Sequence, residues 1–289
     1  MNQHLLVFTV AITCWYGAAL YYSAPDGPVT GVGDEGAGQS APYQGKKLPD
    51  FAQIVDVAEK KRRFFDFLYP FIVDQNRLLT QKRSRLLALR GKPLDDSELR
   101  WVSDLAQKYR LSWQVDQTEA ADGVEVPREV LDELLVRVDQ IPPSLVMAQA
   151  ANESAWGTSR FARQGNNLFG QWCFSKGCGI VPASRPQGKS HEVRRFKTVA
   201  GSVAGYFHNI NSQPSYHELR ELRSSFRRVG RGHEAGEWLA EGLLSYSSRR
   251  EEYVREIQAM IRSNRLAEYD RGVLGSSQLA RGAGADGAG

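Results

Sequence analysis

Apolar residues recur every three or four positions along most of the chain from residue 51 to residue 263, and no other feature constrains the fold as strongly. This spacing gathers apolar side chains on one face of an α-helix. It predicts helices over residues 51–72, 95–109, 127–138, from 142 onward, and over 199–212, 216–228, 234–244 and 250–263. Pro70 is expected to kink or split the first helix, because proline removes a backbone hydrogen bond.

Residues 180–196 break the helical pattern with Gly, Pro and short β-prone pieces, which predicts a small hairpin or lobe. The expected fold class is therefore mainly α: a helical lobe with a small β-hairpin lobe, preceded by a helical N-terminal region. With 42% hydrophobic and 24% charged residues, the composition is that of an ordinary globular protein, which excludes a wholly disordered chain.

The N-terminal segment Leu5–Tyr22 is an uninterrupted run of uncharged, mostly apolar residues. A helix that crosses a bilayer needs about 17–25 such residues. A secretory signal peptide is the alternative, although no Lys or Arg precedes the run and no clean A-x-A site follows it. Residues 1–23 are thus predicted to be a membrane anchor or signal segment, with the inner membrane as a partner.

Two further segments look unstructured. Residues 24–48 are rich in Gly and Pro and are expected to be a flexible linker. Residues 270–289 contain little core material and are expected to be a disordered tail. Between these segments lie a helical region, 49–112, and a second folded domain, 113–269.

The net charge is only +4, which is too small to indicate a nucleic-acid partner by itself. The excess of basic residues lies in the C-terminal half, where Arg220, Arg223, Arg227, Arg228 and Arg231 fall on or beside one predicted helix. This run is expected to be a solvated helix face. Because no base-stacking aromatic residues are interleaved with it, no nucleic-acid partner is expected.

The stretch 142–170 begins with an Ala-rich apolar helix that holds a single acid, Glu153, near its end. Burial, the negative end of the helix dipole and the neighbouring Trp156 all favour the neutral form of this carboxyl. A neutral carboxyl can protonate a leaving oxygen near neutral pH, so Glu153 is a candidate general acid. The alternative is a surface glutamate at a helix end.

Three motifs in this region resemble a known family. Residues 150–157 (AANESAWG), 159–162 (SRFA) and 166–170 (NNLFG) are similar to the mannosyl-glycoprotein endo-β-N-acetylglucosaminidase domain of glycoside hydrolase family 73. The sequence WCF at 172–174 resembles its Bax-like bacterial members. The resemblance covers about residues 127–266 and implies a lysozyme-like fold. It also implies a peptidoglycan hydrolase that cleaves the GlcNAc–MurNAc bond, with Glu153 as general acid.

The resemblance implies two further catalytic residues. Tyr246 matches a tyrosine that contacts the substrate and aids catalysis, although Arg249 replaces the acid that usually follows this motif. The alternative for Tyr246 is a tyrosine at a helix start with its ring in the core. Glu192 occupies about the place of a second acid. Its neighbours Arg194 and Arg195 leave open that Glu192 is instead a solvated ion-pair partner.

Substrate binding is expected from the glycan-facing wall that Asn167, Phe169 and Gly170 build. Trp172 either stacks on a sugar or packs against the protein. Cys173 and Cys178 bracket a short loop, and export would allow a local disulfide there. No His or Cys pair has zinc-ligand spacing, so neither a metal nor a cofactor is expected.

The expected location is the bacterial cell envelope, either anchored in the inner membrane and facing the periplasm or secreted to the periplasm, with peptidoglycan strands as partner. Two other functions stay open. One is a lytic transglycosylase, which shares the lysozyme-like fold. The other is a non-catalytic glycan-binding scaffold, in which the Phe-rich helix 51–72 docks a partner.

Overall fold

The computed structural model describes residues 47–113, 125–183, 185, 187–229, 234–271 and 273. The predicted membrane or signal segment, almost all of the linker and the tail from residue 274 onward lie outside the described residues. The elements, in chain order, are η1 (Phe51–Gln53), α1 (Val57–Ala88), α2 (Asp96–Lys108), α3 (Arg128–Arg137), α4 (Pro143–Ser154), α5 (Arg160–Gly165), β1 (Trp172–Cys173), β2 (Gly179–Ile180), β3 (Glu192–Arg194), α6 (Val199–Ser212), η3 (Pro214–Tyr216), α7 (His217–Val229), α8 (Ala235–Leu239), η4 (Ala240–Leu243), α9 (Glu251–Ser263) and η5 (Leu266–Asp270).

The first long helix begins later than the periodicity predicts. A short 3₁₀ turn forms η1, and α1 starts only at Val57, where the side chain of Asp56 accepts a hydrogen bond from the backbone of Glu59. Val55, whose spacing from Phe51 would place it on the apolar face of the predicted helix 51–72, is 94% exposed. The helix then runs unbroken through Pro70, so the proline does not split it.

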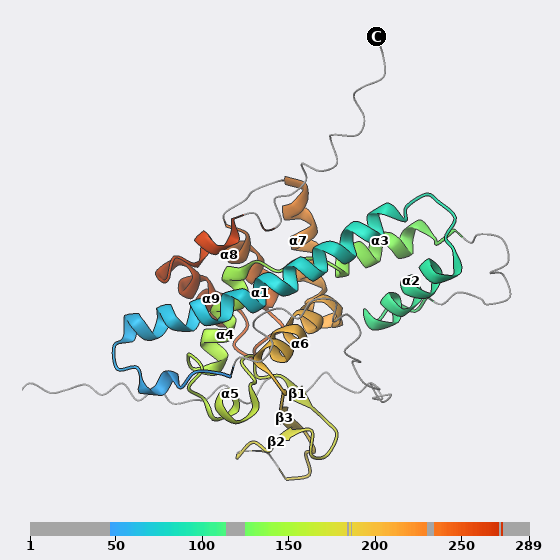
Figure 1. The fold of residues 1–289 in the computed structure, drawn as a ribbon. Coiled ribbons are helices and arrows are strands. Elements are labelled where there is room, and N and C mark those ends of the chain that lie inside the picture. Colours follow the sequence, from blue (N-terminus) through green and yellow to red (C-terminus); the bar gives the residue numbers. More distant parts are fainter. Residues whose placement is uncertain are drawn as a thin grey trace, which may run out of the picture.

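Helix α4 lies at the centre of the helical lobe and is almost wholly buried. It contacts α1, α8, α9 and η5, and α1 crosses the lobe from one side to the other (Figure 1). The aromatic face of α1 enters the same core: Phe64 is 0% and Phe65 is 5% exposed. This face is therefore not available to dock a partner, and that part of the scaffold hypothesis is wrong.

Two buried side chains fix the start of α4. Asn76 of α1 donates to the carbonyl of Ile141 and accepts from its amide, at 2.8 and 2.9 Å. Asp270 accepts from the amide and the hydroxyl of Ser144, at 2.8 and 2.6 Å. Because Asp270 is buried and bonded, the boundary of the tail at residue 270 is too early, and the folded part includes this residue.

The β-lobe is a three-stranded antiparallel sheet in the order β1-β3-β2. Its register pairs Trp172 with Val193 and Ile180 with Val193. The hairpin predicted over 180–196 therefore forms part of a larger unit, which begins at Trp172. The sheet lies at one end of the molecule, next to α5 (Figure 1).

Two arginines of α7 are buried rather than solvated, so the prediction of a solvated basic face is wrong for them. Arg220 is 1% and Arg223 is 0% exposed. Arg223 donates to the carbonyls of Val136 and Gln140, at 2.8 and 3.0 Å, and Arg220 donates to that of Ile210, at 2.9 Å. These carbonyls lie at or just beyond the ends of α3 and α6, where the helix itself offers no donor, and the guanidinium groups supply it.

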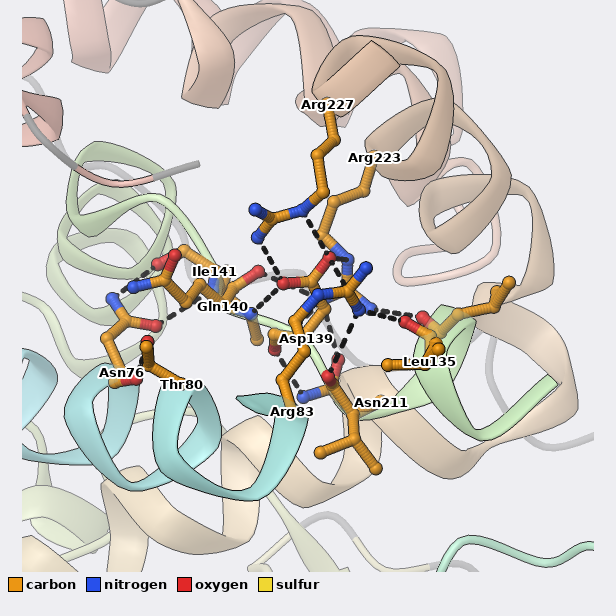
Figure 2. Close-up of polar contacts among 12 residues, drawn as sticks. Asn76, Thr80, Arg83, Leu135, Asp139, Gln140, Ile141, Asn211, Arg223 and Arg227 are labelled. Atoms are coloured by element: carbon orange, nitrogen blue, oxygen red, sulfur yellow. Dashed lines mark hydrogen bonds and ion pairs between the residues drawn. The ribbon is translucent and has the colours of Figure 1, made fainter. Parts of the chain in front are cut away.

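The carboxylate of Asp139 forms a buried charge cluster with three arginines, Arg83, Arg223 and Arg227 (Figure 2). It is 2% exposed and lies 3.0 Å from Arg227 Nε, 3.5 Å from Arg83 Nη1 and 3.9 Å from Arg223 Nε. The cluster joins α1, α7 and the segment between α3 and α4. Of the other two arginines in the run, Arg228 is exposed and Arg231 lies outside the described residues.

The predicted fold class, mainly α with a small β-lobe, is confirmed. In the described part of the chain, no helix has both the length and the apolar character needed to span a membrane.

Candidate active site

Helix α4 ends in an unusual turn directly after Glu153. Ala155, Trp156 and Gly157 all have left-handed backbone conformations, with φ of 49°, 59° and 77°. Ser154 braces this turn, because its hydroxyl donates to the carbonyl of Ala150 and accepts from the amide of Gly157, at 2.6 and 2.8 Å. Non-glycine residues in this conformation are strained, and such strain concentrates at functional sites.

Aromatic residues of η1 and α1 hold the turn in place. A Cβ atom at Gly157 would lie 2.7 Å from Cδ2 of Phe51, so only glycine fits there. The Trp156 ring packs edge-on against Phe64 and Phe65, at centroid distances of 5.9 and 5.3 Å. The backbone that follows Glu153 is therefore fixed by the N-terminal helical region.

The carboxyl of Glu153 is half-buried, and its Oε1 atom accepts a hydrogen bond of 2.9 Å from the hydroxyl of Tyr253. Burial raises the pKa of Glu153 to about 7, against the lowering effect of the Tyr253 hydroxyl; the nearby Glu256 also raises it and Arg249 lowers it. A carboxyl with this pKa is protonated in a large fraction of molecules at neutral pH. It can therefore donate a proton to a leaving group.

Several tyrosine rings surround this carboxyl. The ring of Tyr246 stacks on that of Tyr253, with centroids 5.3 Å apart, and the Tyr246 hydroxyl donates to the carbonyl of Phe169 at 2.9 Å. The Phe169 ring stacks in turn on Tyr206, at 4.2 Å. Burial raises the pKa of Tyr206, Tyr246 and Tyr253 well above their usual value, so all three are neutral near pH 7.

The NLFG turn brings backbone next to the acid. Gly170 has φ of +64°, and a Cβ atom added to it would lie 3.6 Å from Glu153 Oε2. Asn167 is 1% exposed and shapes the turn: its amide donates to the carbonyls of Gln171 and Arg194, at 2.8 and 2.9 Å. Asn167 and Phe169 are thus buried supports of the turn, whereas Gly170 lies beside the carboxyl.

The β-lobe holds the remaining predicted residues. Glu192 is 5% exposed, and its carboxylate accepts from the backbone amides of Gly177 and Gly179, at 3.0 and 2.8 Å, which lower its pKa. It therefore braces the loop between β1 and β2 instead of facing solvent as an ion-pair partner. A disulfide joins Cys173 and Cys178 across this loop, as the sequence allowed.

Trp172 lies on the same lobe, in strand β1. Its ring stacks on the imidazole of His191, with centroids 4.4 Å apart and an interplanar angle of 8°. One face of the indole is therefore covered by the protein.

Comparisons with known proteins agree with the motifs. The profile of the family described as mannosyl-glycoprotein endo-β-N-acetylglucosaminidase matches residues 133–266. The protein bax of Escherichia coli (strain K12) is 31% identical over 218 residues, which cover 75% of this chain and 74% of that protein. The chain belongs to this glucosaminidase family. It is a glycoside hydrolase.

Among solved structures, the catalytic domain of the autolysin Auto from Listeria monocytogenes is similar to this glucosaminidase. It is 16% identical, the TM-score is 0.38, and the match covers 76% of this chain and 92% of that one.

The family profile leaves out η1 and α1, which precede residue 133. Yet these elements provide Phe51, Phe64 and Phe65, which hold the turn after Glu153. In this glucosaminidase the N-terminal helical region therefore supports the turn that follows Glu153.

The sequence alone assigns no role to two residues that contact Glu153 or its hydrogen-bond partner. In the sequence, Tyr253 is one tyrosine of the predicted last helix, and Gln149 lies on the same helical face as Glu153. The spacing of Gln149 and Glu153, four residues apart on a buried helix, was the available signal. In the described part of this glucosaminidase, no group of three or more His, Cys, Asp or Glu residues is arranged to hold a metal ion.

Proposed function

We propose that this glucosaminidase is a peptidoglycan hydrolase that cleaves the GlcNAc–MurNAc glycosidic bond with Glu153 as general acid. One observation carries the proposal: the half-buried carboxyl of Glu153, with a pKa raised to about 7, lies beside the side-chain-free position Gly170. Family membership and the resemblance of the motifs to peptidoglycan hydrolases support the choice of substrate.

In the proposed reaction, Glu153 gives its proton to the glycosidic oxygen, and the bond between that oxygen and C1 of GlcNAc breaks. Water adds to C1, so the new chain end is a reducing GlcNAc. The proton lost by the water restores the acid. Tyr246 supports this step indirectly, because its hydroxyl donates a hydrogen bond to the carbonyl of Phe169 and so holds the turn next to the acid.

The other predicted residues take supporting roles in this proposal. Asn167 and Phe169 shape the turn that presents Gly170 to the sugar. Trp172, whose ring stacks on His191, contacts the glycan from the β-lobe in this proposal. Glu192 holds the loop of the disulfide in place.

Glu192→Gln tests whether the second acid does chemistry. Because the carboxylate of Glu192 already accepts two backbone amides, we expect this variant to lose less than about tenfold in initial rate. The measurement is the release of soluble fragments from purified peptidoglycan, and the matched variant is Glu153→Gln.

A loss as large as that of Glu153→Gln would instead assign Glu192 as the base that activates water. The reaction would then invert the anomeric centre, which needs two carboxyl groups about 6.5–9.5 Å apart. A small loss leaves assistance by the acetamido group of the substrate as the route, and Tyr246→Phe would then cost more than Glu192→Gln.

We also propose a location in the cell envelope, with residues 1–23 as an inner-membrane anchor or an export signal. The apolar run Leu5–Tyr22 supports export. The disulfide between Cys173 and Cys178 supports an oxidising compartment.

Mass analysis of the products formed from purified peptidoglycan tests the proposed function. We expect fragments with a reducing GlcNAc end, which borohydride converts to the alcohol and which carry one oxygen from solvent water. Fragments with an anhydro-MurNAc end and no solvent oxygen would mean a lytic transglycosylase. Binding without release of fragments would mean a glycan-binding scaffold.

A further inference from the structure

We propose that Tyr253 and Gln149 are positioning residues that fix the proton of Glu153 on its Oε2 atom, the oxygen beside Gly170. The proposal rests on the proposed function, because it concerns the acid of that reaction. It assigns different tasks to the two carboxyl oxygens: Oε1 accepts a hydrogen bond from the protein, and Oε2 gives the proton to the substrate.

A chain of buried hydrogen bonds with a defined direction leads to Oε1. The hydroxyl of Tyr206 donates to Gln149 Oε1, because a carbonyl oxygen can only accept. The amide nitrogen of Gln149 then donates to the hydroxyl of Tyr253, at 3.0 Å. The Tyr253 hydroxyl in turn donates its single proton to Glu153 Oε1, at 2.9 Å.

Burial and ring stacking hold the side chains of this hydrogen-bond chain in place. Gln149 is 0% exposed, and Tyr206 and Tyr253 are each 1% exposed. Phe169 stacks on Tyr206, and Tyr246 stacks on Tyr253, so neither ring turns freely away from its partner. In such a low-dielectric environment each hydrogen bond strengthens the next one.

The consequence for Glu153 follows from the donor at Oε1. The carbonyl oxygen of a neutral carboxyl is a stronger acceptor than its hydroxyl oxygen, so a donor at Oε1 favours the tautomer with the acid proton on Oε2. Oε2 lies next to Gly170, where a side chain would come within 3.6 Å of it. The absence of a side chain at this position leaves space for a glycosidic oxygen beside the proton.

Titratable groups from several elements lie near Glu153. They are Tyr206 of α6, Tyr216 of η3, Tyr246 and Arg249 of the segment before α9, and Tyr253 and Glu256 of α9. Burial raises the pKa of each tyrosine, so the tyrosines are neutral near pH 7. Arg249 and Glu256 form an ion pair with an N–O distance of 2.5 Å, and they act on the pKa of Glu153 in opposite directions.

The direction of the hydrogen-bond chain predicts the sign of the change in the pKa of Glu153 when a donor is removed. A donor at Oε1 stabilises the ionised carboxyl, so Tyr253→Phe should raise the pH at which Glu153 loses its proton by about one unit. Gln149→Met should raise it by less, because it only weakens the donor. Tyr69→Phe is the matched control: the Tyr69 ring packs on Tyr269, and its loss should leave the titration unchanged.

Two readouts on the folded full chain test this. One is the carboxyl ¹³C NMR titration of Glu153, assigned by comparison with Glu153→Gln. The other is the alkaline limb of the rate of fragment release from purified peptidoglycan. An upward shift in both Tyr253→Phe and Gln149→Met, and none in Tyr69→Phe, is the expected result.

A downward shift would overturn the proposal, because it would mean that Glu153 donates to Tyr253 and that the chain runs the other way. An unchanged titration in a folded variant would also overturn it, since both residues would then only fill space. If one variant does not fold, the sign of the shift in the other decides. If the wild type releases no fragments while the NMR titration still shifts upward, the proposed function fails and the proton assignment stands.

Discussion

Glu153→Gln is expected to abolish the release of fragments from purified peptidoglycan, with a rate loss of about 10²–10⁴-fold, because an amide cannot protonate the leaving oxygen. The fold should survive, since glutamine has the same shape and its carbonyl oxygen can still accept from Tyr253. Above pH 7 the melting temperature should equal or exceed that of the wild type. Burial raises the pKa of Glu153 to about 7, so the ionised carboxyl weakens the fold there.

The matched control for this variant is Glu251→Gln in the first turn of α9. The Glu251 side chain is 64% exposed and pairs only weakly with Arg250, at 3.8 Å. The Glu251→Gln variant should release fragments from purified peptidoglycan at the wild-type rate. A Glu153→Gln protein that is folded and still active would remove Glu153 as the acid.

Asp139→Asn is expected to cause the largest loss of stability, about 3–5 kcal/mol in the free energy of unfolding. Asp139 is the carboxylate that faces the guanidinium groups of Arg83, Arg223 and Arg227, and it is 2% exposed. Without its charge, three cations remain in or near the core with only neutral acceptors. Urea denaturation followed by circular dichroism measures the loss.

Asp132→Asn is the matched control, because Asp132 also pairs with arginines, Arg90 and Arg128, but its side chain is 43% exposed. Surface pairs of this kind contribute about 0–1 kcal/mol. Equal losses in the two variants would mean that the buried cluster contributes no more than surface ion pairs.

The sequence predicts the elements of this fold well where local signals suffice. Helix α6 runs over Val199–Ser212 as expected, with Thr198 capping its start. Asp95 caps α2 through a capping box with Glu98, two residues that lie close together in the chain. In both cases periodicity and a nearby polar residue contain the necessary information.

Sequence patterns do not predict the role of a residue whose partner lies far away in the chain. The arginines of α7 look like a solvated face, because nothing nearby in the chain shows that the carbonyl of Val136, 87 residues away, needs a donor. The same holds at the candidate active site, where Tyr253 donates a hydrogen bond to Glu153 although the two residues are 100 positions apart in the chain. The role of Glu192 also differs from both local expectations, since its partners are backbone amides of the disulfide loop and not the adjacent arginines.

The motif residues around Glu153 have physical roles that the pattern alone does not reveal. Ser154 braces the left-handed turn, and Gly157 is required by the ring of Phe51. The role of Gly157 depends on η1, which contains Phe51 and comes from a distant part of the sequence. Glu153 can be proposed as the acid from the sequence, but the way its carboxyl is held cannot.

The central claim is that burial keeps Glu153 as a neutral acid near physiological pH. Its most direct test is the carboxyl ¹³C titration of Glu153 in the wild-type protein without substrate, identified as the resonance missing from Glu153→Gln. The predicted result is a titration near pH 7. A titration close to the ordinary glutamate value of 4.5 would contradict the claim, because the carboxyl would then be ionised at neutral pH.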